Sequence, residues 1–286
     1  MGGYTSSHPA VREGTMRLRR CKRGILKFCN MALLIIGLMI SAGCLHPGGL
    51  KADSALPFAP GERLRFDLRW TVVPAGEAIL EVLPIQIIDG RQVYHFRLTA
   101  ESNAFVDLFY KVRDRIDAYA SIDMSRAVRY FHKQNEGDNH KDVTVHFDWE
   151  KDIALYSDGS SNKKIKIKPG TFDPLSVFYY SRMAGFKADG TIECPVSDGK
   201  KCVDGMARII KKETIKIASG TYETFLIEPD LKHVGGVFKK SKDAKIRLWI
   251  TADDRRIPVK IASKVSVGSF VGELIAIEKG DFKDNI

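Results

Sequence analysis

Most of the chain alternates between apolar and polar residues with a period of two. In RLRFDLRW, residues 63–70, every second residue from Leu64 to Trp70 is apolar, and the residues between them are charged. VTVHFDW repeats the pattern, with Val143, Val145, Phe147 and Trp149 on one face. Such alternation is typical of antiparallel strands that bury one side and expose the other.

Turn residues separate these runs at short intervals. Asp89-Gly90 divides AILEVLPIQII from RQVYHFRLTA, and this dipeptide supplies the positive φ angles that a tight hairpin needs. Further alternating runs fill residues 213–229, 245–267 and 268–279, with Gly, Asp and Pro at the bends. The sequence therefore predicts a succession of β-hairpins.

Two segments break the period of two. In TFDPLSVFYYSRM, Asp173 can cap a helix and Pro174 suits its first turn. Leu175, Phe178 and Tyr179 then have the i, i+3, i+4 spacing of one apolar helical face. This predicts a helix of two to three turns packed on a sheet, and SNAFVDLFYKV predicts a shorter one.

These patterns predict a mainly β fold: a large, twisted antiparallel sheet or sheets, curved into a half-barrel or barrel, with one or two short helices. We expect this domain to span residues 61–282. It could form one unit or two sheet-rich halves that meet near residues 170–190.

The N-terminus has the pattern of an export signal. A basic stretch from Arg17 to Lys27 precedes the apolar run Met31–Ile40, and no further charge occurs until Lys51. The apolar run is shorter than the roughly 20 residues that span a bilayer, and it ends in small residues. We therefore expect residues 1–43 to be a signal segment, with Met16 as an alternative start.

The small residues before Cys44 extend this prediction. ISAGC resembles the lipobox of bacterial lipoproteins, in which the cysteine is lipidated and becomes the new N-terminus. The alternatives are cleavage without lipidation and a retained membrane anchor. Residues 44–60, rich in Pro, Gly and Ala, predict a flexible linker. Bacterial lipoproteins that are retained in the inner membrane have Asp directly after the lipidated cysteine. Leu45 stands at this position here, which favours an outer-membrane anchor facing the periplasm.

The net charge of +10 does not indicate a nucleic-acid-binding protein. Residues 1–43 hold seven Lys or Arg and one Glu, so 38 basic and 34 acidic residues remain after them. The basic excess belongs mainly to the signal segment, and we expect no nucleic-acid partner. The expected partners are the membrane, through the anchor, and a lipid or another envelope protein.

Two of the five cysteines fall within the expected domain. Cys194 and Cys202 lie in the turn-rich segment ECPVSDGKKCVDG. In an oxidising envelope such a pair predicts a disulfide. Two unbonded thiols and a metal site are the alternatives.

The sequence contains no recognisable catalytic constellation. None of the five histidines after the linker forms a metalloprotease motif, although His132 and His140 flank a loop that could hold a weak metal site. Ser197 and Lys200 match the S-x-x-K pattern without its partner motifs. TADDRRIP reads as a charged hairpin turn. We therefore predict no catalytic residue, no cofactor and no metal.

Lysines alternate with isoleucines in KKIKIK. Lys164, Lys166 and Lys168 would line one side of the strand. Lysines on an edge strand prevent sheets from associating. An alternative role is contact with anionic lipid head groups.

FDPLSVFYYSR, GTYETFLIEP and LWITADDRRIPVKIASKVSVGSFVGEL resemble the bacterial domain-of-unknown-function family 3108. The resemblance runs from about Pro57 to about Gly280. It implies an exported β-rich protein and lends no catalytic residues, because no activity is established for the family.

Three functional hypotheses follow. The first is a non-catalytic envelope protein whose curved sheet binds an amphipathic or lipid-like ligand. The second is an envelope hydrolase that acts on glycan or peptide through carboxylates that sequence cannot pair. The third is a structural or assembly module that binds envelope proteins through exposed strand edges.

Overall fold

The computed structural model describes residues 56–187, 189–231, 244–265 and 268–279. In this part of the chain the two helices are α2 (Ala104–Asp107) and α3 (Ser176–Arg182). The strands are β1 (Glu62–Trp70), β2 (Val73–Ile88), β3 (Arg91–Ser102), β4 (Arg113–Ser121), β5 (Ala127–Glu136), β6 (Asn139–Asp148), β7 (Ile153–Ser157), β8 (Asn162–Lys166), β9 (Thr191–Ser197), β10 (Cys202–Ile217), β11 (Gly220–Pro229), β12 (Lys245–Thr251), β13 (Pro258–Val265) and β14 (Gly268–Lys279).

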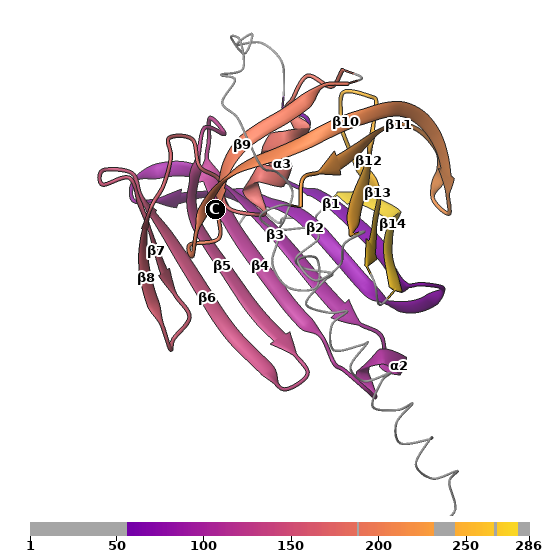
Figure 1. Ribbon diagram of the computed structural model, residues 1–286, viewed down its shortest axis with the longest axis horizontal. Helices are drawn as coiled ribbons and strands as arrows, with labels where there is room; N and C mark the ends of the chain where they lie inside the picture. The colour runs from indigo at the N-terminus through magenta and orange to yellow at the C-terminus, as the bar shows by residue number, and fades with distance from the viewer. Residues whose placement is uncertain (1–55, 188, 232–243, 266–267, 280–286) are drawn as a thin grey trace, which may run out of the picture.

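All of these strands belong to one antiparallel sheet in the order β8-β7-β6-β5-β4-β3-β2-β1-β14-β13-β12-β11-β10-β9. Strands that follow one another in sequence pair, except β8 and β9, which form the two edges; β1 joins the two arms by pairing with β14. The sheet curves around α3 (Figure 1). The predicted mainly β, curved and barrel-like fold with short helices is confirmed.

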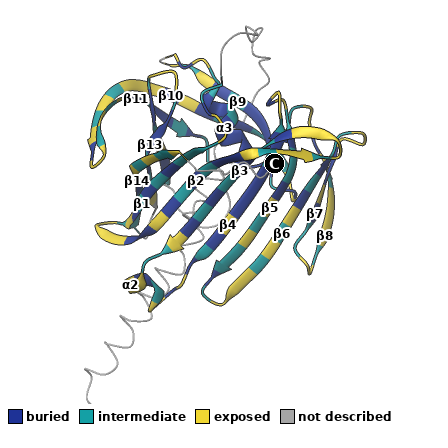
Figure 2. Ribbon diagram, turned by 180° about the vertical axis from the view of Figure 1, so that it is seen from behind, coloured by how far each residue is buried: buried dark blue, intermediate teal, exposed yellow. Residues whose placement is uncertain are grey.

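The period of two in β1 sets which face is buried. Leu64, Phe66 and Leu68 are buried on the inner face, the side that faces α3. On the outer face Arg65 donates to Glu77 of β2 and to Glu278 of β14, at 3.1 and 3.2 Å. Figure 2 shows the same alternation of buried and exposed residues along the strands.

Helix α3 lies inside the curve of the sheet. Asp173 Oδ1 accepts hydrogen bonds from the backbone N–H groups of Leu175 and Ser176, each at 2.9 Å, and so caps the turn that leads into α3, which itself begins at Ser176. Tyr179 stacks on Phe96 of β3 with ring centroids 3.9 Å apart. We expected a single apolar face, but α3 is buried on nearly all sides, because the two arms of the sheet and the chain before β1 enclose it.

The last residue of α3 is a buried arginine. The Arg182 side chain has 0% exposure and forms two hydrogen bonds to the Glu62 carboxylate, at 2.6 and 2.8 Å. It also donates to the carbonyls of Pro57 and Arg255, at 2.8 and 2.9 Å. One side chain therefore joins α3 to the start of β1 and to the β12–β13 connection.

Alternate hairpin turns lie at opposite ends of the sheet. Asp89 and Gly90 connect β2 to β3 with φ angles of 50° and 73°, as a tight primed turn requires. The opposite end carries the β1–β2 turn and α2, the short second helix that the sequence predicted. Asn103 links these two: its side-chain amide donates to Pro74 O at 2.8 Å.

The two edges of the sheet are protected differently. At one edge β8 carries Lys163, Lys164 and Lys166, which discourage pairing with another strand, as expected for lysines at a sheet edge. At the other edge Phe172 forms a parallel bridge with Val196 of β9. The chain that leads into α3 therefore covers part of this edge.

The predicted signal segment, Cys44 and most of the predicted linker lie outside the described residues. Within the described part, neither helix has the length and hydropathy that a transmembrane helix requires.

Candidate functional site

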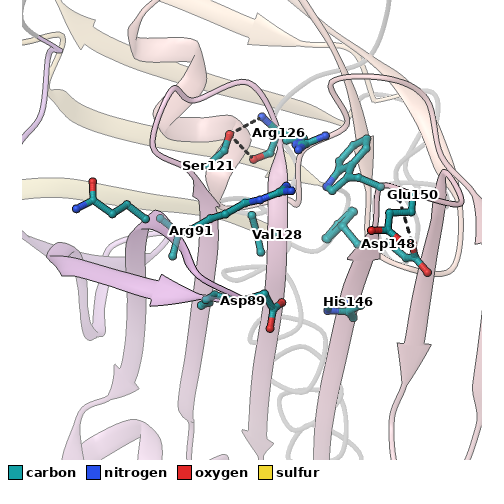
Figure 3. A pocket seen from close by; sticks show the side chains of 13 residues that line it. Asp89, Arg91, Ser121, Arg126, Val128, His146, Asp148 and Glu150 are labelled. Carbon is teal, nitrogen blue, oxygen red and sulfur yellow. Dashed lines mark hydrogen bonds between the residues drawn. The ribbon is translucent and has the colours of Figure 1, made fainter.

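A pocket lies where three hairpin connections meet, at the end of the sheet opposite α2. Its volume is about 430 Å³, within the range of small-ligand sites. The β2–β3, β4–β5 and β6–β7 connections and the strand ends beside them form its wall (Figure 3). The lining residues are Ile88, Asp89, Arg91, Gln92, Val93, Ser121, Arg126, Val128, His146, Phe147, Asp148, Trp149 and Glu150.

Two arginines enter this pocket from different connections, as Figure 3 shows. The Arg126 guanidinium lies over the Trp149 ring, 5.1 Å from its centroid. Among the described residues no carboxylate forms an ion pair with Arg91 or Arg126. Both guanidinium groups can therefore bind an anion that enters the pocket.

Hydrogen bonds in the β4–β5 turn fix the position of Arg126. Ser121 Oγ accepts from the backbone N–H groups of Ser125 and Arg126, at 3.1 and 3.2 Å. Trp149 Nε1 donates to Ala127 O at 2.7 Å, which holds the indole against the same turn. Hydrogen bonds within and to the β4–β5 turn therefore position both Arg126 and Trp149.

Two of the three lining carboxylates have basic partners. Asp89 pairs with Arg129 at 3.0 Å, and Asp148 pairs with Lys151 at 2.8 Å. The hydrogen bond from Lys151 lowers the pKa of Asp148. Glu150 is the exposed third carboxylate. The pocket thus combines two available cations with the apolar side chains of Val93, Val128 and Phe147.

A second hollow lies on the inner face of the sheet, against Phe178 of α3. Phe66, Leu68, Leu80, Leu248 and Ile261 are among its apolar lining residues. Its volume is about 20 Å³, which leaves room for about one water molecule. In this form the hollow is too small for an amphipathic ligand.

Two carboxyl groups meet on the inner face near α2. Asp114 and Glu136 are 2% and 0% exposed, and the side chains of Asp114, Gln134 and Tyr110 surround the Glu136 carboxyl. Burial and the adjacent Asp114 raise the pKa of Glu136 to about 8. Because both groups are closed off from solvent, they do not form the open cleft that a hydrolase needs.

Three histidines take structural positions, whereas His146 lines the pocket. His95 Nε2 lies 2.8 Å from Asp117 Oδ1 on the outer face, in a network with Arg97 and Arg115. His132 lies 4.0 Å from Asp114, and His140 lies 3.1 Å from Asn135. In the described part of the chain, no three His, Cys, Asp or Glu residues come together as a metal site.

The predicted disulfide does not match the β9–β10 register. Cys194 lies opposite Gly205, and Cys202 lies opposite Ser197. The two cysteines are thus three positions apart along the ladder, or about 10 Å. A disulfide needs Cα atoms closer than about 7 Å, and the structure forms no bond between these two residues.

The S-x-x-K match and the charged TADDRRIP segment both stabilise turns. Ser197 Oγ accepts a hydrogen bond from Gly199 N at 3.1 Å and is buried, so it supports the turn before β10. Asp253 accepts from Arg255 at 2.7 Å within the β12–β13 connection. The S-x-x-K match and the TADDRRIP segment therefore both form turns in the structure.

Sequence reasoning missed the pocket and the buried carboxyl pair. Arg91 and Arg126 are 35 positions apart and come together only because alternate hairpins end on the same side. The one available signal was Arg91 directly after the predicted Asp89-Gly90 turn. For Asp114 and Glu136 the signal was an acidic residue on the apolar face of an alternating strand.

The fold and the pocket define a class: a barrel-like antiparallel β protein with a mixed polar and apolar cavity at one end. A solved β-barrel-like protein of the DUF1849 family from Brucella abortus has this fold, with a TM-score of 0.52 and 12% identity. That comparison covers 77% of this chain and 98% of the other.

The family of proteins of unknown function DUF3108 matches residues 65–275, so the chain belongs to this family. The resemblance seen in the sequence is confirmed. No curated protein matched the chain.

Two further solved structures are more distant. A candidate lipoprotein from Parabacteroides distasonis ATCC 8503 has a TM-score of 0.36 and 10% identity, over 79% of this chain and 100% of its own. A candidate exported protein with a YmcC-like fold from Bacteroides fragilis NCTC 9343 has a TM-score of 0.31 and 8% identity, over 78% and 98%.

Proposed function

We propose that this protein is exported to the bacterial cell envelope and binds a small amphipathic anion in the pocket lined by Arg91 and Arg126. The observation that carries the proposal is the pair of arginines without carboxylate partners in the described structure, facing a cavity of about 430 Å³. The protein acts as a binding protein and not as an enzyme.

The envelope location rests on the N-terminal sequence. Residues 1–43 have the order of an export signal, and Cys44 stands where a lipoprotein carries its lipid. A lipidated Cys44 followed by Leu45 would tether the domain to the outer membrane, facing the periplasm. Two or more acyl chains are needed for stable anchoring, which lipidation of this kind supplies.

The pocket suits a ligand with an anionic head and a short apolar body. A planar guanidinium matches the geometry of a phosphate or carboxylate group, and each charge-assisted hydrogen bond contributes roughly 1.5–3 kcal/mol. Trp149, Val128 and Phe147 provide the apolar contact. In this proposal the ligand binds at the end of the sheet and not within its curved inner face, which is the location that the sequence-based hypothesis favours.

Calorimetric titration of the full chain in nanodiscs tests this proposal. Hexyl phosphate is the probe, and hexanol is the uncharged comparison. We expect hexyl phosphate to bind at one site, and Arg91→Gln and Arg126→Gln each to weaken binding about tenfold or more. Arg247→Gln is the matched control, because Arg247 of β12 lies away from the pocket and pairs with Glu228 of β11. Unchanged affinity in both pocket variants would refute the proposal.

The two alternative functions receive less support. A hydrolase would need converging carboxylates in an open cleft, whereas Asp114 and Glu136 are buried. An assembly module would need an accessible strand edge, whereas lysines line β8 and the chain before α3 covers part of β9.

A further inference from the structure

An apolar tip stands at the end of the sheet opposite the pocket. We define it by five side chains of the β1–β2 turn and of α2 with the residues after it. Their exposed fractions are 82% for Val72, 42% for Val73, 59% for Phe105, 78% for Leu108 and 41% for Phe109. Figure 2 shows both segments largely as exposed surface.

The tip is held in place by its own hydrogen bonds. Asn103 Oδ1 accepts from Val106 N at 2.9 Å and caps α2, while the Asn103 amide donates to Pro74 O in the neighbouring turn. The N–H groups of Phe109 and Tyr110 donate to Val106 O, at 2.9 and 2.8 Å. A segment that enters the apolar part of a bilayer needs its backbone groups paired in this way.

The charges around the tip suit a lipid surface. Asp107 is the only acidic residue of α2, and it turns inward to pair with Arg113 at 2.6 Å. Lys111 follows Phe109 by two residues. Arg69, which pairs with Asp67 at 2.6 Å, precedes Val72 by three, and both basic side chains are exposed. Exposed apolar residues flanked by basic ones are typical of surfaces that bind anionic membranes.

We propose that the apolar tip inserts into a lipid bilayer. The tip consists of side chains from two adjacent turns at one end of the sheet (Figure 1). It is a projecting surface, whereas a site that receives a segment of another protein is usually a groove. If Cys44 is lipidated, as proposed above, residues 45–56 can extend to about 40 Å, whereas β1 is about 30 Å long. The tip can therefore reach the same membrane that anchors the chain.

Photocrosslinking from single positions tests this insertion. Phe105 or, in the control, Phe131 is replaced by p-benzoylphenylalanine in the full chain, which is then reconstituted in vesicles of phosphatidylethanolamine and phosphatidylglycerol. Phe131 is 36% exposed on β5, away from the tip. The N-terminal anchor is the same in both proteins, so the difference in adducts reports the tip alone.

We expect lipid adducts at position 105 to exceed those at position 131 about tenfold or more. Leu108→Asp in the first protein should remove most of these adducts, since an ionised group opposes insertion. Equal lipid adducts at the two positions would overturn the proposal. Adducts at position 105 with a second copy or another protein in place of lipid would overturn it too. The titration of hexyl phosphate tests the pocket independently.

Discussion

Arg182 and Glu62 form a buried ion pair that joins α3 to the first strand of the sheet. The Arg182 side chain is fully buried, and its Nη1 lies 2.6 Å from Glu62 Oε1. The guanidinium also lies over the rings of Phe58 and Tyr179, 5.5 and 5.6 Å from their centroids. Aromatic rings and carbonyl groups thus enclose a charge that water cannot reach.

Breaking this pair should cost much of the stability of the domain. Arg182→Met leaves Glu62 without its partner, and removing one partner of a buried ion pair costs about 3–5 kcal/mol. Urea unfolding followed by tryptophan fluorescence measures the change. Arg65→Met is the control, because water screens the Arg65 pairs with Glu77 and Glu278, and it should have a much smaller effect. Equal effects of the two changes would contradict this assignment.

The buried carboxyl Glu136 should make the domain less stable as pH rises. Its pKa is raised to about 8 in the folded protein, so the unfolded chain ionises first and the folded state binds more protons. The free energy of unfolding should therefore fall from about pH 4.5, the ordinary pKa of a glutamate, to about pH 8 and then level off.

Glu136→Gln should remove most of this dependence, since the amide resembles the neutral acid. The test uses the range from pH 6 to pH 8, because burial also raises the pKa of Asp173 to about 6 and Asp173 adds its own fall in stability below that pH. Glu101→Gln is the control, because Glu101 is 65% exposed on the outer face. A slope between pH 6 and pH 8 that Glu136→Gln leaves unchanged would show that another group titrates.

Gly137 should not tolerate a side chain. Its φ is +57°, and an added Cβ would lie 2.6 Å from Tyr110 Cε2. Gly159 has a φ of +79° with open space around it, so Gly159→Ala reports only the backbone strain. We expect Gly137→Ala to cost a further 1–3 kcal/mol or so in the free energy of unfolding. Similar thermal unfolding of the two variants would contradict the close packing of Tyr110 on this turn.

Asp117 should stabilise the outer face of the sheet. Burial opposes its ionisation, but hydrogen bonds from His95, Arg115 and Arg97 outweigh this effect and lower the pKa of Asp117. Its contribution should therefore be present above its ordinary pKa of 3.8 and be lost as pH falls below it. Asp117→Asn should cost about 1.5–3 kcal/mol at pH 7 and less at pH 3, measured by urea unfolding. An equal cost at the two pH values would argue against an ionised Asp117.

Sequence patterns predict most of this fold, because the strands and tight turns of an antiparallel sheet are determined by residues that lie close together in sequence. Leu64, Phe66 and Leu68 alternate with charged residues, and the inner face buries them. Asp89-Gly90 identifies a hairpin turn from two residues. The enclosure of α3 was not predictable in this way, since it depends on the closure of β1 against β14, which are about 200 residues apart.

The candidate site was harder to predict for the same reason. Arg91, Arg126 and Trp149 belong to three separate connections, and their meeting depends on strand order and twist. The apolar tip was also missed, because the spacing in SNAFVDLFYKV predicts a helix but not which of its faces remains uncovered.

Native mass spectrometry of the full chain, purified from the bacterial envelope, tests ligand binding most directly. We expect a protein peak with the added mass of an amphipathic anion, and loss of that mass in the Arg91→Gln/Arg126→Gln double variant. A wild-type protein that carries no such mass, or a mass that persists in the double variant, would contradict this expectation.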